Sequence, residues 1–143
     1  MQRKPIQQSL FNLNTFNHAV RDVKLYICRV VQDSGLSREQ AMDKVNELAK
    51  AYGVRLIKGN GNGVSMETWE KWLNPADETR VPPLKALPLI CAALETLEPL
   101  RPLVELAGGR LVDEQDARLL DWAKAYHRAK NARQEMKKLE EGI

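Results

Sequence analysis

The chain has 143 residues, of which 43% are hydrophobic and 29% charged, and its formal net charge is +3 at pH 7. This length and composition fit one soluble globular domain with a buried core, and they leave room for an appended helix. No apolar run approaches the ~20 residues of a membrane span and the first residues lack the apolar core of a signal peptide, so we expect a cytoplasmic protein without membrane contact.

Residues 1–14 are expected to form a polar arm before the first helix. That helix is predicted to begin near Phe16 and to end at Gly35, since glycine commonly follows the last turn of a helix. Its apolar residues recur at the period of one helix face: Val20, Val23, Ile27, Val30 and Val31. Cys28 lies in this pattern and Cys91 in a later one, which is typical of buried free thiols in a reducing compartment.

A second helix is predicted between Ser37 and Gly53. Ser37 and Gln40 stand three residues apart, as in a capping box, where each side chain bonds the backbone of the other residue. The apolar stripe consists of Ala41, Val45, Leu48, Ala49 and Tyr52. The start signal, the period and the stop signal therefore agree.

The segment after this helix has the only strand-like pattern in the chain. Residues 54–58, VRLIK, are followed by GNGNG, in which Asn-Gly occurs twice. Such a pattern is typical of a short hairpin or of a mobile loop, and we expect one or the other at residues 54–64. A phosphate site is the alternative, but the Gly-Lys-Ser/Thr ending of a Walker loop is absent and no second strand follows.

A third helix is predicted to begin after its N-cap, Ser65, and to end at Asn74, because Pro75 disfavours helical geometry in the residue before it. Its apolar residues share one face: Met66, Trp69, Trp72 and Leu73. The opposite face carries Glu67, Thr68, Glu70 and Lys71. Either this outer face contacts a partner, or the tryptophans only fill the core and the outer face is solvated.

After a loop at residues 75–83, a helix is predicted from Leu84 to Leu97, with Pro88 tolerated only near its first turn. Pro102 is expected to start a short helix that runs to residues 108–109, both glycine. From Asp113 the chain is predicted to be helical almost to its end. The sequence therefore predicts an all-α fold with five or six helices.

The last predicted helix, residues 113–143, has apolar residues at alternating spacings of three and four, which form a heptad seam: Trp122, Ala125, Ala129, Ala132, Met136, Leu139 and Ile143. The seam spans about three heptads, so we expect this helix to form a homodimer. In the alternative, an apolar group packs on the first domain and the rest of the helix projects: Leu119, Leu120, Trp122, Ala123 and Tyr126.

Residue patterns typical of catalysis are missing from the sequence. His18 and His127 have no partners at metal-ligand spacing, and no Gly-x-Ser-x-Gly elbow occurs. The acidic residues Asp113, Glu114 and Asp116 suit the start of a helix better than an acid–base pair. We therefore expect a protein that is not an enzyme and that holds neither a metal nor a cofactor.

The third helix belongs to a longer pattern. Ser65, Thr68, Trp69, Leu73, Asn74 and Pro75 are followed by a polar loop and a leucine-rich helix with Leu84, Ala86, Leu87, Ile90 and Leu94. In this respect residues 36–110 resemble temperate-phage regulatory proteins of the CII type, in the lambda-repressor-like helix-turn-helix class. The resemblance implies a helix-turn-helix domain over residues 15–112, a double-stranded DNA partner and a role in transcription regulation.

In that class the second helix of the pair enters the major groove. The expected DNA-binding residues are Lys50, Arg55, Lys58, Asn60, Asn62, Ser65, Glu67, Thr68 and Lys71. Two features depart from the family. Residues 54–64 lengthen a turn that is short in the family, and Glu67 and Glu70 repel phosphate, although a carboxylate can accept a hydrogen bond from cytosine. A non-catalytic protein-interaction module that uses the C-terminal helix is the alternative function.

Overall fold

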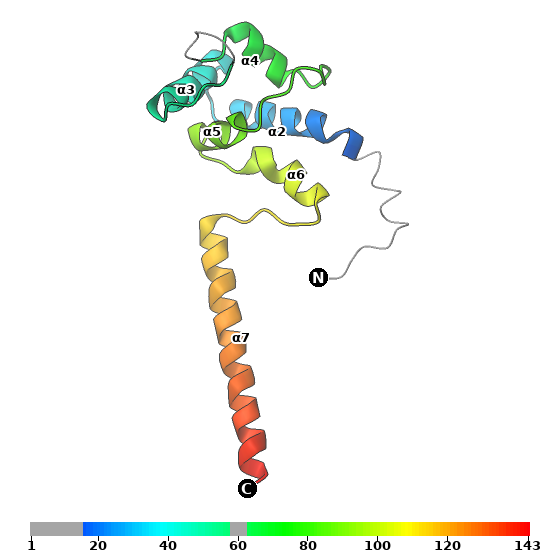
Figure 1. Ribbon diagram of the computed structural model, residues 1–143, viewed down its shortest axis with the longest axis vertical. Helices are drawn as coiled ribbons and strands as arrows, with labels where there is room; N and C mark the ends of the chain where they lie inside the picture. The colour runs from blue at the N-terminus through cyan, green and yellow to red at the C-terminus, as the bar shows by residue number, and fades with distance from the viewer. Residues whose placement is uncertain (1–15, 58–62) are drawn as a thin grey trace. The chain divides into compact units, whose positions relative to one another are not determined.

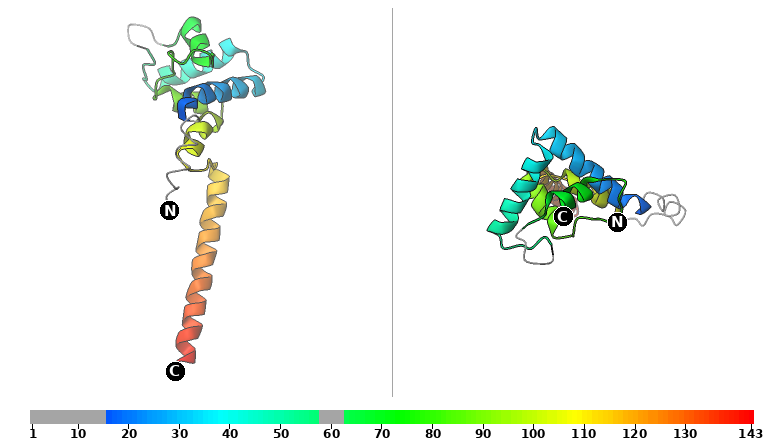
Figure 2. Two further views of the ribbon diagram at one scale, coloured as in Figure 1. Left: turned by 90° about the vertical axis from the view of Figure 1, so that its right-hand side faces the viewer. Right: turned by 90° about the horizontal axis from the view of Figure 1, so that it is seen from above.

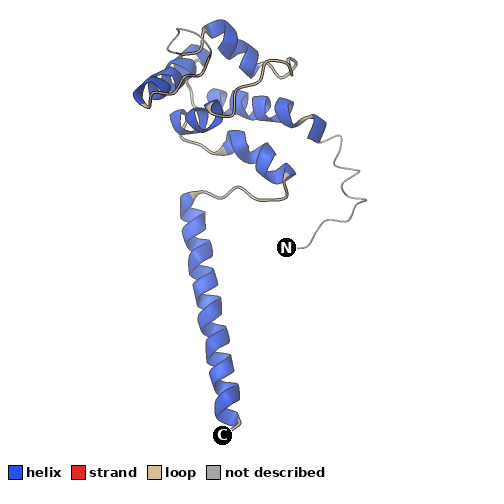
Figure 3. Cartoon of the chain, in the orientation of Figure 1, coloured by secondary structure: helices blue, strands red, loops and turns tan. Residues whose placement is uncertain are grey.

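The computed structural model of the protein describes residues 16–57 and 63–143. The chain is divided into two compact units between Leu111 and Val112 (Figure 1). Every regular element of the described residues is a helix, which confirms the predicted all-α class (Figure 3).

The helix α2 lies in the middle of the first unit. The helical elements of this unit are α2 (Ala19–Asp33), α3 (Arg38–Ala51), α4 (Met66–Leu73), α5 (Ala86–Ala93), the 3₁₀-helix η1 (Glu98–Leu100) and α6 (Arg101–Leu106). α4 packs on one side of α2, and η1 and α6 pack on the other (Figures 1 and 2). α3 packs against α5 and also contacts α4. The position of α4 is therefore set by α2 and α3.

The core is built from the helix faces that the apolar periodicity identified. Its members from the first two helices are Val23, Ile27, Val31, Ala41, Val45 and Ala49. Four residues of the predicted stripes lie outside the core, and there the prediction was wrong: Val20 and Val30 are only half-buried, and Tyr52 and Met66 are exposed. Tyr52 is 75% exposed because it is the C-cap residue beyond the last turn of α3, and Met66 is 38% exposed in the first turn of α4.

The predicted ends of the first two helices are confirmed. Ser37 and Gln40 form the reciprocal capping box, with the Ser37 hydroxyl accepting from the Gln40 backbone at 3.0 Å and the Gln40 side chain accepting from the Ser37 backbone at 2.9 Å. Gly35 and Gly53 follow the two helices with φ of 74° and 66°. This left-handed conformation is accessible to glycine without steric cost.

The helix predicted from Leu84 to Leu97 is shorter than expected. α5 covers only Ala86–Ala93, and Pro88 falls in its first turn, where proline is tolerated. The helix stops because Glu95 adopts a left-handed conformation with φ of 54°, and the Thr96 backbone then donates to the Cys91 oxygen at 3.0 Å. Glutamate rarely takes this conformation, so the sequence did not indicate the stop or the separate η1 that follows.

Of the two alternatives expected at residues 54–64, a short hairpin or a loop, the described part of the segment does not form the hairpin. Residues 54–57 and 63–65 have no regular structure, and residues 58–62 lie outside the described residues. Leu56 and Val64 are each 4% exposed and belong to the core. No described strand pairs with this segment. Its strand-like alternation therefore reflects only that Leu56 packs inward while Arg55 is exposed.

The second unit consists mainly of α7 (Glu114–Glu141), a helix of 28 residues. Its N-cap is Asp113, whose carboxylate accepts from the Asp116 backbone at 2.8 Å. The prediction of a helix from this point almost to the end is confirmed. None of the side chains of α7 is buried.

Candidate nucleic-acid interface

The inward face of α4 anchors this helix in the core. Trp69 and Leu73 are fully buried and Trp72 is 4% exposed. The two indole rings have centroids 6.3 Å apart and are tilted by 59°. Burying one large apolar side chain contributes roughly 1.5–3 kcal/mol, so these residues stabilise an eight-residue helix that is too short to form alone. The opposite face of α4 is therefore left for other contacts.

The C-terminal end of α4 is held by a buried lysine of α2. Lys24 is fully buried, and its ammonium donates to the backbone oxygens of Lys71 at 2.9 Å, of Asn74 at 3.1 Å and of Asp77. The last carbonyls of a helix lack intrahelical donors and carry the negative end of its dipole. A cation at this place therefore joins α4 and its following turn to α2.

Burial shifts the pKa of two polar groups on this face of α2. Loss of hydration lowers the pKa of Lys24, although the carboxylate of Asp77 opposes the shift. The Cys28 thiol donates to the Leu73 backbone oxygen at 2.9 Å, and burial raises the pKa of that thiol. A raised pKa keeps the thiol protonated and weakly nucleophilic. Cys28 and Cys91 are both free, as predicted, with Cys91 buried and Cys28 half-buried.

These contacts of α2 were not predicted, although the sequence indicates that Lys24 is buried. The lysine stands four residues after Val20 and three before Ile27, so it occupies the apolar stripe of the helix. A lysine at such a position is rarely buried unless its charge has partners. The identity of those partners was beyond the sequence, because they lie 47 to 53 residues further along the chain.

The N-terminal end of α4 is fixed by its own cap and by α3. The Ser65 hydroxyl accepts from the Thr68 backbone at 3.2 Å, which confirms the predicted N-cap, and it also donates to the Thr68 hydroxyl at 3.2 Å. On α3, the Asn46 side chain donates to the Val64 oxygen at 3.0 Å and accepts from the Val64 backbone N–H at 2.9 Å. The chain entering α4 is therefore tied to α3.

Gly63 makes the tie between Asn46 and Val64 sterically feasible. A Cβ atom added at Gly63 would lie 2.5 Å from Oδ1 of Asn46. Nonbonded atoms do not approach so closely, so any larger residue displaces the asparagine from its two hydrogen bonds. At least one glycine of the GNGNG run thus has a packing role, which the turn interpretation did not include.

The outward face of α4 carries two ion pairs. Lys71 and Glu67 are one turn apart and approach to 3.1 Å, while Arg38 at the start of α3 approaches Glu70 to 2.5 Å. The four side chains line a shallow pocket together with Leu73, Asn74 and Pro75. Both carboxylates of this face therefore have a cation beside them. Exposed ion pairs are weak, so either cation can exchange its carboxylate for another anion.

The other predicted contact residues fall into two groups. Lys50 and Arg55 are exposed at the end of α3 and just after it, and neither takes part in an ion pair with another described residue. Lys58, Asn60 and Asn62 lie outside the described residues. Arg38 was not among the predicted contacts, because its place beside α4 depends on a tertiary contact across 32 residues.

The positive charge of the chain is unevenly placed. Lysines and arginines balance aspartates and glutamates across residues 16–57 and 63–143 taken together. The surplus of +3 therefore belongs to Arg3, Lys4 and Lys58, which lie outside the described residues. Attraction of an anion to the described part of the first unit depends on local cations such as Arg38 and Lys71 rather than on net charge.

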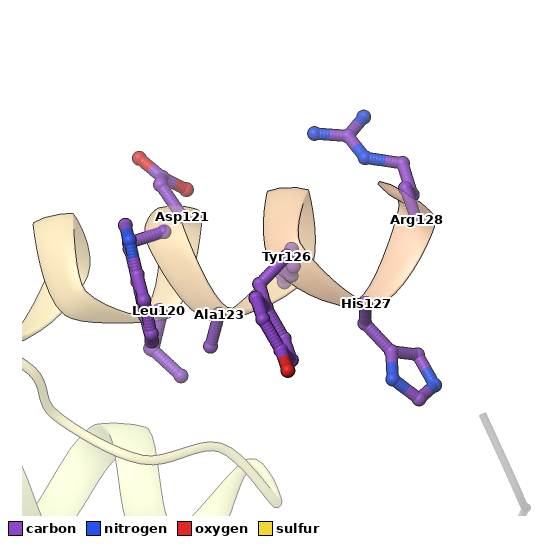
Figure 4. Close-up of a pocket in the computed structure, with 8 residues that line it drawn as sticks. Leu120, Asp121, Ala123, Tyr126, His127 and Arg128 are labelled. Atoms are coloured by element: carbon purple, nitrogen blue, oxygen red, sulfur yellow. The ribbon is translucent and has the colours of Figure 1, made fainter. Parts of the chain in front are cut away.

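A second candidate surface lies on α7. Trp122 and Tyr126 stack with ring centroids 5.6 Å apart and planes within 19° of parallel. They border a groove on the surface of the helix, in which Tyr126 and His127 point to one side and Asp121 and Arg128 to the opposite side (Figure 4). An apolar stripe flanked by charged residues is typical of a helix that binds another helix.

No protein-family model matches the chain, and no significant match is found among curated proteins or solved structures. Within residues 16–57 and 63–143, no helix has the length and apolar character required to cross a membrane. The same residues contain no group of three or more His, Cys, Asp and Glu side chains arranged to hold a metal ion.

Proposed function

We propose that this protein is a phage- or prophage-type regulator of transcription that binds double-stranded DNA through the outward face of α4. In this proposal α3 is the supporting helix of a helix-turn-helix unit and α4 is the helix that enters the major groove. α7 joins two copies. The residues that resemble the CII type, from Ser65 to Pro75, coincide with α4 and its two ends.

The observation that carries the proposal is the two-sided character of α4. One side is anchored by buried indoles, and both ends are fixed by hydrogen bonds from α2 and α3. The other side presents Glu67, Thr68 and Lys71 with Glu70 and Arg38 beside them. A reading helix must be held rigidly while its polar face stays open, and α4 meets both conditions.

The paired charges suit contact with a phosphate backbone. Arg38 and Lys71 are held beside carboxylates, so their exchange onto phosphates leaves Glu67 and Glu70 free to accept from cytosine amino groups. Each phosphate neutralised in this way releases counterions and adds about 0.9 to the salt dependence of binding. Lys50 at the end of α3 and Arg55 just after it supply further phosphate contacts.

The proposal is tested by releasing Arg38 from its carboxylate. Glu70→Gln is expected to raise affinity for random duplex DNA and to steepen the salt dependence by about 0.9, because the guanidinium becomes free for a phosphate. Arg38→Gln is expected to weaken binding, since it leaves Glu70 uncompensated. Affinity is measured by fluorescence anisotropy at several salt concentrations.

Glu105→Gln is the matched control. Glu105 is also paired with an arginine, Arg101, at 3.1 Å, but it lies on α6, on the opposite side of α2 from α4. The two glutamine variants have the same net charge, so any general attraction of DNA is equal in both. Identical DNA affinities of Glu70→Gln and Glu105→Gln at every salt concentration would show that α4 is not part of the interface.

The second candidate function is a non-catalytic interaction module that uses α7. The observation that favours it is the exposed apolar stripe of α7, with Trp122 67% and Leu139 68% exposed. In that case the first unit does not bind DNA, and none of the α4 variants changes any measured association.

A further inference from the structure

The seam of α7 is an apolar face with bulky ends and a small centre. We define it as Trp122, Ala125, Ala129, Ala132, Met136 and Leu139, which take the a and d positions of successive heptads. The large members are well exposed, Trp122 at 67%, Met136 at 60% and Leu139 at 68%. An apolar seam of this kind is covered when a second helix packs against it.

Charged and aromatic residues flank the seam on its two edges. Asp121, Arg128 and Glu135 occupy g positions on one edge. Tyr126, Arg133 and Glu140 occupy e positions on the other. Figure 4 shows Arg128 and Tyr126 on opposite sides of the helix, as this assignment requires. Side chains at e and g contact those of the partner helix and determine its orientation.

A parallel pair of α7 helices brings like charges together. In that arrangement a g residue faces the partner's e residue in the next heptad. Arg128 then faces the partner's Arg133, and Glu135 faces the partner's Glu140. Each contact occurs twice by symmetry, so the parallel pair has four repulsive contacts along its edges.

An antiparallel pair brings complementary groups together instead. There g residues face g residues and e residues face e residues. In the register that covers the whole seam, Arg128 faces the partner's Glu135 in an ion pair. On the other edge Tyr126 faces the partner's Arg133, an arrangement that favours a cation–π contact.

The sizes of the seam residues favour the same orientation. In the antiparallel register Trp122 lies against the partner's Leu139, Ala125 against the partner's Met136 and Ala129 against the partner's Ala132. In an in-register parallel pair, Trp122 meets its own copy while three successive layers contain only alanine. Bulky layers then hold the helices apart and leave voids at the alanines, and such voids destabilise a packed interface.

We infer that α7 pairs with α7 of a second copy of this chain in an antiparallel coiled coil, with Arg128 and Glu135 as the ion pair that sets its orientation. The inference rests on the self-association within the proposed function but not on DNA binding. It defines an interaction surface, its partner and its register.

Sedimentation equilibrium of the full chain tests the inference through charge reversals. Arg128→Glu is expected to raise the dimer dissociation constant roughly tenfold, because an attractive contact becomes repulsive at both symmetric positions. Combining it with Glu135→Arg is expected to restore the wild-type constant, since the ion pair is rebuilt with reversed signs. Lys130→Glu is the matched control: it makes the same charge change at a b position away from the seam and is expected to have no effect.

The sign of the Arg128→Glu effect separates the two orientations. In a parallel pair the new carboxylate faces the partner's Arg133, so the variant binds more tightly, and that result would overturn the antiparallel register. A wild-type chain that sediments as a monomer would overturn the pairing itself. Because the DNA affinity of the α4 variants is measured in a separate experiment, failure here is distinguishable from failure of the α4 interface. Circular dichroism verifies that α7 remains helical in each variant.

Discussion

Replacing Lys24 by methionine tests whether a buried ammonium holds α4 in place. Methionine has a similar length and keeps the apolar contacts of the side chain, but it cannot donate to the oxygens of Lys71, Asn74 and Asp77. The variant therefore separates the hydrogen bonds of the ammonium from the packing of its methylene groups.

The expected magnitude follows from the partners of the three oxygens. A hydrogen bond to a charged group contributes about 1.5–3 kcal/mol, which places three of them at about 4.5 kcal/mol or more. Two effects reduce this figure. The Lys71 and Asn74 oxygens each retain a backbone donor, at 3.3 Å and 3.1 Å, and the variant avoids burying a charge. We expect a loss of about 2–4 kcal/mol in the free energy of unfolding.

Denaturant unfolding followed by tryptophan fluorescence measures this loss, because Trp69 and Trp72 report on α4 directly. Arg29→Met serves as the control, since Arg29 lies on the same helix but is exposed, and its guanidinium lies over the Tyr26 ring at 5.1 Å. We expect a change below about 1 kcal/mol for the control. A Lys24→Met variant as stable as the wild type would refute the role of the ammonium.

Three further predictions concern the surroundings of α4 and the buried thiol of α5. Gly63→Ala should destabilise the chain by about 1–3 kcal/mol by displacing Asn46, and it should be nearly neutral in an Asn46→Ala background, as a double-mutant cycle of unfolding will show. The unfolded chain binds more protons at Lys24 than the folded chain between the lowered pKa of the folded state and the usual value of 10.5. The free energy of unfolding of the wild type, relative to that of Lys24→Met, should therefore rise as the pH is raised through that window. A fall in this difference would contradict the lowered pKa of Lys24. Burial raises the pKa of Cys91 to about 11, so its labelling by a disulfide reagent at pH 8 should follow global unfolding, and rapid labelling of the native chain would disprove its burial.

The helices that carry α4 were predictable from the sequence because local signals agree there. The capping box of Ser37, the glycine after α3 and the proline after α4 each act within a few residues of a helix end. The inward position of Trp69 and Trp72 follows from their spacing alone. These features establish that a short helix exists and which face it buries.

The contacts that fix α4 were not predictable, because they join residues distant in the chain. Arg38 reaches Glu70 across 32 residues, and Asn46 reaches Val64 across 18. Short-range patterns contain no information on such pairs. The prediction of where α5 ends was wrong for a different reason. Glu95 takes a left-handed backbone conformation that its own side chain disfavours, and the hydrogen bonds around it stabilise that conformation.

The length of α7 determines how far apart the two ends at which α7 begins lie in the inferred dimer. In the antiparallel register the two Glu114 residues are separated by about 33 residues of helical rise, or about 50 Å. One turn of duplex DNA measures about 34 Å, so this separation exceeds the spacing of half-sites on adjacent turns. In the inferred dimer, the rigid helix pair therefore keeps the two ends at which α7 begins about one and a half turns of duplex DNA apart.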